Sequence, residues 1–327
     1  PTSLGRGPMT DDQPAEGRSD LDGLSIDRAV DAVAEGAGDA GELRETLAIV
    51  AEDGVVRRSA VDDAVANASM VATTAETRTE LAGGQLSDVR ETAAPVADLP
   101  LVSARLNDYE ARLDAVEDRS EALGDAIQEI LDSKADGDLY EIARRIRRVT
   151  NAASDVQRAA DDLQFELDSF EGWLTDADQR TEELRGDIDA LAESVDELDD
   201  TADALADDGA GPDRDPASTW VAATTQHRVA GLMITDLRAE LAALRTWAAR
   251  EEGTESPPDD VDARLDAVES THEAVGDRLA ACADPEWTAA FDDRLASLDE
   301  RLSAMEPPVE WGEVEAVVAE HRPADGR

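Results

Sequence analysis

The chain has 327 residues, of which 41% are hydrophobic but only 3% are aromatic. A single large globular core needs bulky side chains that this composition lacks, whereas a narrow seam between helices needs only one small or aliphatic residue every three or four positions. The composition therefore disfavours one large core and favours helices that pair along narrow apolar stripes.

The charge balance is strongly acidic. The chain carries 78 Asp and Glu against 30 Lys and Arg, a formal net charge of −48, and Lys134 is its only lysine. So many like charges repel one another in dilute buffer, but at 1 M salt the Debye length falls to about 3 Å and most of the repulsion disappears. We interpret the acid excess and lysine depletion as adaptation to a cytoplasm with molar salt. The alternative, a disordered acidic chain, is disfavoured by the heptad order described below.

Two further features bear on location. Cys282 is the only cysteine, so no disulfide can form within the chain, which suits a reducing cytosol. The longest apolar run, Val229–Ile234, is too short to span a membrane, and no secretory signal is expected. The sequence therefore predicts a cytoplasmic protein without membrane contacts.

The N-terminal third divides into a tail and a small domain. Residues 1–20 are rich in Gly, Pro and Asp and are predicted to be a disordered acidic tail. Residues 21–95 predict a small helical domain of about four helices. Within it, Asp39 and Ser59 are placed to cap helices, and Thr77 with Glu80 resembles a further helix start.

A turn is expected at Asp53-Gly54 in this domain. Residues 53–59 also fit the turn or wing of a helix-turn-helix. The acidic surroundings disfavour contact with a phosphate backbone, so we favour a plain helical bundle here.

A coiled-coil pattern begins after Pro95 and Pro100. Apolar residues recur at alternating spacings of four and three, which is typical of a coiled-coil stripe; the positions are Val102, Leu106, Tyr109, Leu113, Val116, Ser120, Leu123, Ile127 and Ile130. Residues 133–138 predict a turn. A second stripe then keeps its heptad register from Leu139 to Leu205, with Thr181 its only polar member.

The second stripe predicts one unbroken helix roughly 100 Å long, at 1.5 Å per residue. Residues 99–207 are therefore predicted to be a long coiled-coil hairpin. Residues 208–252 predict a linker and a third coiled-coil helix, 259–306 a short helical hairpin, and 307–327 a C-terminal tail. Packing the first and third helices against the two halves of the long one would bury its stripe. The predicted fold is all-α, an antiparallel coiled-coil rod with a small N-terminal helical domain.

Few residues are candidates for chemistry. His227, His272 and His321 lie on separate segments, and no pair has metal-ligand spacing. His227 and His272 fall on or beside apolar stripes, where we expect hydrogen-bonded seam residues. Carboxylate pairs lie on solvated helix faces, and no phosphate-binding loop is present. We therefore predict no catalytic, cofactor-binding or metal-binding residue, and no enzyme.

One cationic cluster departs from the acidic background, and it consists of Arg144, Arg145, Arg147 and Arg148. It is a candidate partner-binding cluster that docks an acidic protein surface or a phosphate. Alternatively it balances nearby acids, with Glu141 and Arg145 at i,i+4 spacing. Binding of nucleic acid is disfavoured because molar salt removes most phosphate-contact affinity.

Four stretches carry a family resemblance, and they are Glu52–Val56, Ala93–Leu99, Arg112–Arg119 and Val156–Ala160. They resemble stretches of a family of acidic coiled-coil proteins of halophilic archaea labelled halo-transducer proteins. The label implies kinship with sensory transducers of chemotaxis and phototaxis. The chain departs from that pattern because it has no membrane span and lacks the long hairpin tip with which those receptors engage their kinase.

The expected function is a non-enzymatic coiled-coil scaffold or interaction protein of a halophilic archaeal cytoplasm. Partners are expected to be proteins that bind along coiled-coil faces or at rod ends, and a homodimer is an open option. One alternative is a soluble accessory of a chemotaxis- or phototaxis-type signal transduction system. A second is a chromosome-associated protein with a helix-turn-helix-like N-terminal domain.

Overall fold

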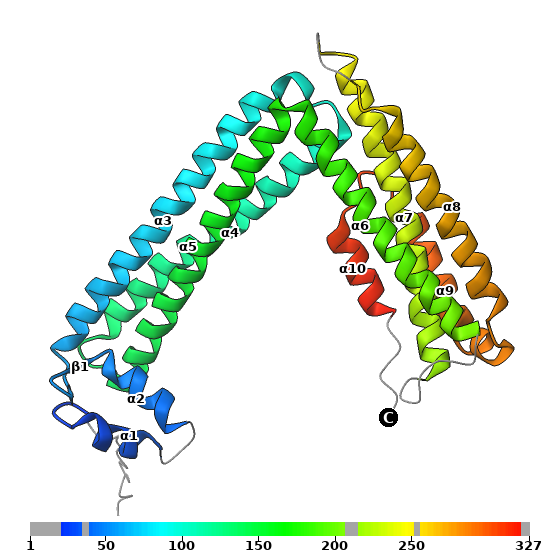
Figure 1. Ribbon diagram of the computed structural model, residues 1–327. Helices are drawn as coiled ribbons and strands as arrows, with labels where there is room; N and C mark the ends of the chain where they lie inside the picture. The colour runs from blue at the N-terminus through cyan, green and yellow to red at the C-terminus, as the bar shows by residue number, and fades with distance from the viewer. Residues whose placement is uncertain (1–20, 35–38, 207–214, 252–255, 322–327) are drawn as a thin grey trace, which may run out of the picture. The chain divides into compact units, whose positions relative to one another are not determined.

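The computed structural model describes residues 21–34, 39–206, 215–251 and 256–321. About 85% of the structure is helical and only one short two-stranded hairpin occurs among the described residues, so the fold is all-α as predicted (Figure 1). None of the described helices is long and apolar enough to cross a membrane. The expected disordered tail, residues 1–20, lies outside the described residues, as do 207–214 of the expected linker and 322–327 of the expected C-terminal tail.

The chain divides into two compact units. The first comprises residues 1–87 and 109–167, and the second comprises 88–108 and 168–327. These boundaries differ from the expected ranges. The sequence predicted that a separate N-terminal domain ends at residue 95. The helix that precedes residue 95 instead shares one hydrophobic core with the helices that follow it.

The first unit begins with α1 (Ile26–Ala34) and α2 (Ala40–Ala48). As predicted, Asp39 caps a helix, because its carboxylate accepts a hydrogen bond from the Gly41 amide at 3.0 Å. The turn at Asp53-Gly54 joins β1 (Ala51–Glu52) to β2 (Val55–Val56) in an antiparallel pair.

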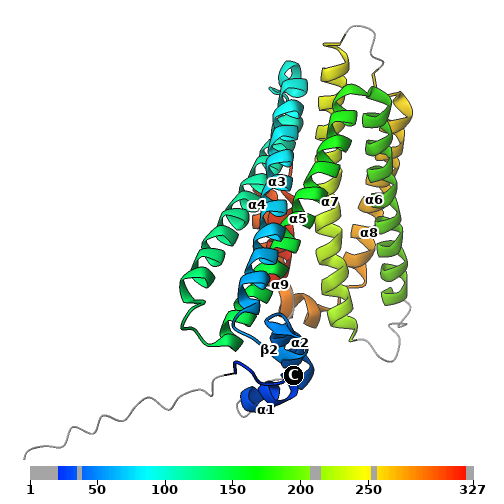
Figure 2. The same ribbon diagram turned by 90° about the vertical axis from the view of Figure 1, so that its left-hand side faces the viewer.

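That turn places both central residues at positive φ, 52° for Asp53 and 77° for Gly54. Asp-Gly is the preferred sequence for a two-residue hairpin turn of this kind. The expectation of a plain helical bundle was wrong here, because these turn residues close a β-hairpin between α2 and the next helix. Figure 2 shows the hairpin beside α2.

The next helix, α3, runs from Ala60 to Ala93 and starts where Ser59 predicted. It does not restart at Thr77, which was a wrong prediction. The Thr77 hydroxyl instead donates to the Thr73 carbonyl at 3.0 Å, a bond that a threonine inside a helix makes. A short 3₁₀ turn, η1 (Ala94–Val96), then leads to α4 (Pro100–Ser133).

In the first unit α3, α4 and α5 (Leu139–Thr175) lie side by side (Figures 1 and 2). Their buried residues form one cluster with α1 and α2, whose helix-bundle members include Val61, Val65, Ala68, Ala72, Ala75, Val116, Leu123, Ile130, Ile142, Ile146, Val149, Ala153, Val156 and Ala160. The stripe of α5 is therefore covered by two helices, whereas the sequence predicted a seam with one.

The predicted unbroken helix from Leu139 to Leu205 is wrong. It ends at Thr175, and α6 (Ala177–Ala206) begins after Asp176. The carboxylate of Asp176 accepts hydrogen bonds from the amides of Asp178 and Gln179 at 2.9 and 3.3 Å. Asp176 thus acts as an N-cap that starts a new helix.

In the second unit α6 packs with α7 (Pro216–Ala248) and α8 (Asp259–Ala281). Each helix buries an apolar stripe, and the stripe of α7 includes Trp220, Ala223, Ala230, Ile234, Leu237, Leu241, Leu244 and Ala248. Ion pairs cross between neighbouring helices, for example from Arg238 of α7 to Asp266 of α8 at 2.6 Å.

Two shorter helices complete this unit, α9 (Pro285–Ser303) and α10 (Trp311–Glu320). Pro285 is the first residue of α9, and Asp284 caps this helix. It packs against α7 and α10, and the Arg228 guanidinium of α7 donates to the Leu295 carbonyl at 2.8 Å. The side of α7 that carries Val229 and Leu232 therefore packs against this terminal pair.

Candidate functional site

The arginine cluster lies in the first turns of α5, and two of its members are engaged within the chain. Arg144 pairs with Glu141 at 2.8 Å. Arg147 reaches α2, where it donates to the Thr46 hydroxyl at 2.9 Å and pairs with Glu45 at 3.2 Å. Arg147 therefore holds α2 against α5, although the two contacting residues, Arg147 and Thr46, are 101 positions apart in the sequence.

The other two members differ. Arg145 and Arg148 are exposed and form no ion pair with any described residue. Glu141, which the sequence spacing paired with Arg145, binds Arg144 instead. The structure thus brings the four arginines together on one helix but leaves only two of them available to a partner. Partner binding by this cluster stays a prediction.

A groove between α4 and α5 is a site that the sequence did not reveal. It has a volume of about 500 Å³, and its apolar lining includes Ala115, Val116, Ala159, Leu163 and Phe165. Phe165 is 76% exposed, the highest value among the large hydrophobic side chains of the described residues. The only available signal was an aromatic residue outside the heptad stripe, between Gln164 and Glu166.

One end of this groove is closed by a bidentate ion pair. The Arg112 guanidinium donates to the two oxygens of Glu166 at 2.5 and 2.7 Å. These hydrogen bonds hold the pKa of Glu166 below its usual value, while burial opposes them. The pair joins α4 to α5 and fixes the wall beside Phe165.

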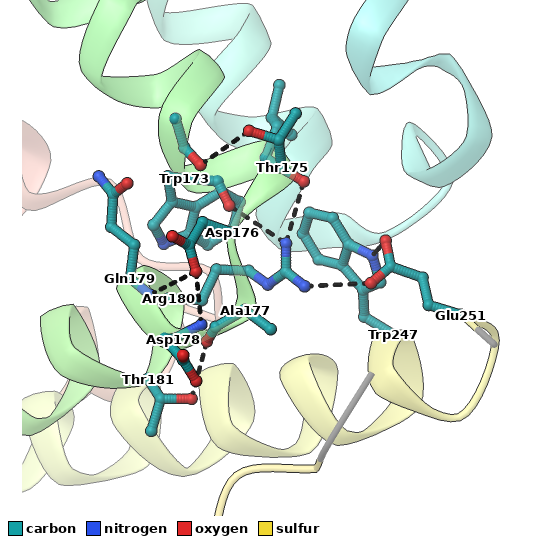
Figure 3. Close-up of polar contacts among 12 residues, drawn as sticks. Trp173, Thr175, Asp176, Ala177, Asp178, Gln179, Arg180, Thr181, Trp247 and Glu251 are labelled. Atoms are coloured by element: carbon teal, nitrogen blue, oxygen red, sulfur yellow. Dashed lines mark hydrogen bonds and ion pairs between the residues drawn. The ribbon is translucent and has the colours of Figure 1, made fainter. Parts of the chain in front are cut away.

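A second cluster of polar groups lies at the corner between α5 and α6 (Figure 3). The Arg180 side chain is only 5% exposed. It donates to the carbonyls of Trp173 and Leu174 at 3.2 and 2.9 Å and pairs with Glu251 at 3.1 Å. Its guanidinium carbon lies 4.0 Å from the ring centroid of Trp247, within cation–π range.

This corner explains how the chain tolerates the break after Thr175. The last carbonyls of a helix have no partners within the helix. Arg180 supplies donors to two of them, and its charge faces the negative end of the α5 dipole. Burial lowers the pKa of Arg180, and the carboxylate of Glu251 opposes that effect.

A third group surrounds the buried carboxylate of Glu240 on α7. The side chain of Glu240 is 13% exposed, and its Oε1 lies 3.7 Å from Arg105 of α4. Arg105 pairs more closely with Glu183 of α6, at 2.7 Å, and its guanidinium lies 4.2 Å from the Trp173 ring centroid. Oε1 of Glu240 accepts no hydrogen bond from the described residues.

The pKa of Glu240 is raised to about 7. Burial is the main cause, because it penalises the charged form; Arg105 opposes it, and the carboxylates of Asp187, Glu183 and Asp236 add to it. Burial and Glu183 raise the pKa of Asp187 as well. Arg105 is thus the cation that faces several carboxylates. Because the pKa of Glu240 is about 7, its carboxyl is protonated below neutral pH.

This arrangement predicts that Glu240→Gln stabilises the protein at about pH 8 but not at about pH 4. The pKa of Glu240 is about 7 in the fold, against an ordinary value of 4.5 for a glutamate in water. The folded state therefore holds the proton more tightly, and wild-type stability falls as pH rises from 4.5 to 7. The gain at high pH is at most about 3 kcal/mol, at 1.4 kcal/mol per pKa unit.

Thermal unfolding followed by circular dichroism in about 2 M KCl measures this effect. Glu193→Gln is a matched control, because Glu193 is an exposed residue on α6. An equal rise in Tm at both pH values, or a similar rise for the control, would contradict the assignment.

His227 of α7 and His272 of α8 form a stacked pair, with ring centroids 3.8 Å apart and an interplanar angle of 6°. Each Nε2 donates to the backbone carbonyl of the other residue, at 2.9 and 2.8 Å. A Cβ on Gly276 would lie 2.8 Å from the His227 Nε2, so a glycine is needed there. The prediction of hydrogen-bonded seam residues is confirmed.

Within the described ranges no group of three or more His, Cys, Asp or Glu is arranged to hold a metal ion. His321 binds the Val317 carbonyl through Nδ1 at 2.7 Å, apart from the other two histidines. No family model, curated protein or solved structure matches the chain. Function is therefore inferred from the chain's own residues.

Proposed function

We propose that the protein is a non-enzymatic scaffold or interaction protein of a halophilic archaeal cytoplasm, built from coiled-coil helices, and that a protein partner docks on the α4–α5 groove. The observation that supports this proposal is the exposure of Phe165, at 76%, beside a groove of about 500 Å³. A partner that covers this side chain and the groove beside it would remove their apolar surface from water, which favours binding.

The scarcity of aromatic residues strengthens this observation. The chain has only three Phe, and burying a Phe side chain stabilises a protein by roughly 1.5–3 kcal/mol. Phe170, five positions along the same helix, is 2% exposed. An aromatic residue left in solvent on the same helix gains that burial energy only when a partner covers it.

The rest of the fold supports a scaffold. Apolar stripes occupy the helix seams, and cross-helix ion pairs such as Arg112–Glu166 and Arg185–Asp260 connect the faces between them. The arginines of the candidate cluster add a charged feature, since Arg145 and Arg148 extend into solvent from α5.

The proposal predicts that Phe165→Gln abolishes capture of a protein partner from a cell extract at molar salt while leaving the fold intact. The reason is that the substitution removes the exposed aromatic surface and alters only a side chain that is 76% exposed. Affinity purification with mass spectrometry measures the bound partner, and circular dichroism confirms helicity.

Met70→Gln is the matched control, because Met70 is 63% exposed on α3 and does not line the groove. The control variant should keep the partner. Retention of every partner by Phe165→Gln would exclude the groove as the docking site.

The same purification separates the alternatives. Recovery of taxis components would favour the signalling accessory. Recovery of DNA would favour the chromosome-associated protein, for which the β1–β2 hairpin after α2 is the relevant feature. The neighbouring Arg58 contributes little to such a contact, since its guanidinium donates to the carbonyls of Lys134 and Gly137.

A further inference from the structure

We infer that His227 and His272 form a pH switch between α7 and α8, in which the stacked rings hold one proton at most and a second proton separates the two helices. This role lies beyond the proposed function and does not depend on the α4–α5 groove. It follows from the hydrogen bonds of the two rings, from their close stacking and from the charges around them.

The hydrogen bonds of the neutral pair fix the tautomer of both rings. Each Nε2 lies 2.9 or 2.8 Å from the backbone carbonyl of the other histidine, and because a carbonyl only accepts, both Nε2 atoms carry hydrogen. The unprotonated nitrogen of each neutral ring is therefore Nδ1. A further proton adds at Nδ1 and makes the ring a cation while it remains in the stack.

Glycines on both helices let the rings approach so closely. Each histidine is followed four residues later by a glycine, Gly231 on α7 and Gly276 on α8, and each glycine faces the ring from the opposite helix. A Cβ on Gly231 would lie 3.3 Å from Cε1 of His272, and one on Gly276 would lie 2.9 Å from Cε1 of His227. The contact is therefore reciprocal, and a ring that leaves the stack also loses its hydrogen bond across the seam.

The stack accepts one proton but opposes a second. The ring centroids are 3.8 Å apart and the interplanar angle is 6°, so two protonated rings would place two positive charges in direct contact. No counterion fits between rings in contact, so molar salt screens this repulsion less than it screens exposed charges. A single protonated ring is tolerated, because a cation is attracted to the face of an aromatic ring.

The surroundings of His227 also disfavour its charged form. Burial lowers the pKa of His227; the hydrogen bond with the His272 backbone opposes that effect, and the charges of His272 and Arg228 add to it. Protonation therefore weakens the contact between α7 and α8 where the folded pair binds fewer protons than the unfolded chain.

The carboxylates of the packed helices are exposed or engaged elsewhere. Paired residues of α6 and α8 differ by 75 in number, which places Glu197 of α6 opposite His272. Glu197 is exposed, as is Glu273 beside His272. On α9, Asp299 pairs with Arg228 at 2.8 Å. Among the described residues no carboxylate forms an ion pair with either ring, so none offsets a second proton.

Nitrogen NMR of the full chain with labelled histidine tests the inference in about 2 M KCl, from about pH 8 to about pH 4.5. The chain has three histidines, and His321, outside the stack, serves as the reference. We expect the pair to take up its two protons in separate steps at least about one pH unit apart, with loss of the stack at the second step. Uptake of both protons in one step with the stack intact would overturn the inference.

Thermal unfolding of the variant that combines His227→Gln and His272→Gln gives a second test. Glutamine can donate to a carbonyl but takes up no proton near neutral pH. The wild-type pair contributes stability that is present above the ordinary histidine pKa of about 6.5 and is lost as pH falls. We therefore expect the Tm of wild type minus that of the variant to decrease by at least about 2 °C from about pH 8 to about pH 5.

This difference cancels the titration of Glu240, which has the opposite sign in the same pH range. Glu240 is present in both proteins and lies roughly 20 Å along α7 from His227, far enough for the two effects to add independently. His321→Gln is the matched control, because it removes a histidine outside the stack. An equal change for the control, or none for the double variant, would overturn the inference, and the NMR experiment decides it even if the double variant does not fold.

Discussion

Replacing Arg180 with Gln is expected to lower the free energy of unfolding by about 3 kcal/mol. The side chain of Arg180 is 5% exposed, and its guanidinium donates to two carbonyls and pairs with one carboxylate. Gln is too short to reach all three groups, so the carbonyls of Trp173 and Leu174 lose a buried donor. Removing one partner of a buried ion pair costs more than the pair itself contributes, because the remaining group keeps its desolvation penalty.

The contacts of Arg180 with Glu251 and Trp247 increase the expected loss of unfolding free energy. Glu251 also accepts a hydrogen bond from the Trp247 indole at 2.6 Å, so its carboxylate is fixed in place and cannot follow a shorter side chain. The Trp247 ring loses the cation that lies 4.0 Å from its centroid. The corner between α5 and α6 should therefore loosen along with the C-terminal end of α7.

Arg185→Gln is the matched control for this change. Arg185 is also on α6 and pairs with Asp260 at 3.2 Å, but its side chain is 31% exposed. An exposed pair contributes about 0–1 kcal/mol and is screened further in molar salt. Thermal unfolding in about 2 M KCl compares the two variants, and equal losses would show that burial of Arg180 does not matter.

The break that Arg180 caps shows where sequence reasoning reached its limit. Leu174, Ala177 and Thr181 keep the heptad register in phase across the break, so the apolar pattern alone predicts one helix. The local signal was Asp176 with Gln179 three residues later, a capping pattern that the unbroken register concealed. Strong periodicity predicted both helices but not the boundary between them.

The sequence also failed to predict that α3 packs against α4 and α5, for a different reason. Buried positions of α3 also alternate by four and three, and they are Val61, Val65, Ala68, Ala72, Ala75, Thr79, Ala82, Leu86, Val89 and Ala93. Because half of them are alanine, the stripe is weak in hydrophobicity although it is regular in spacing. Counting alanine as a core residue would have predicted α3 as a partner of α4 and α5.

Local patterns predicted the caps and turns better than they predicted contacts between distant segments. Asp39 and Asp53-Gly54 act within a few residues, so their roles followed from sequence. Arg147 instead binds Glu45, and only the tertiary structure brings these two together. Phe165 was missed because a search for stripes ignores the residues outside them.

Leu167→Asp is expected to cost several kcal/mol, because it tests the stripe of α5 at a fully buried position. Leu167 is 0% exposed. The change removes roughly 1.5–3 kcal/mol of apolar burial and leaves a carboxylate without a partner in the seam. A typical domain has a free energy of unfolding of only about 5–15 kcal/mol, so a large part of the total is lost.

Asn151→Asp separates burial from charge in this test, because it adds the same carboxylate to the same helix at an exposed position. Its cost should stay within about 0.5 kcal/mol, since a surface substitution away from caps and ion pairs changes stability little. Both variants are compared with wild type by thermal unfolding in about 2 M KCl, where repulsion from the net charge of −48 is screened. If the two variants melted at the same temperature, the helix seams would not be the source of stability. A large loss for Leu167→Asp alone would instead locate that source in the narrow apolar stripes, as expected for a chain with so few aromatic residues.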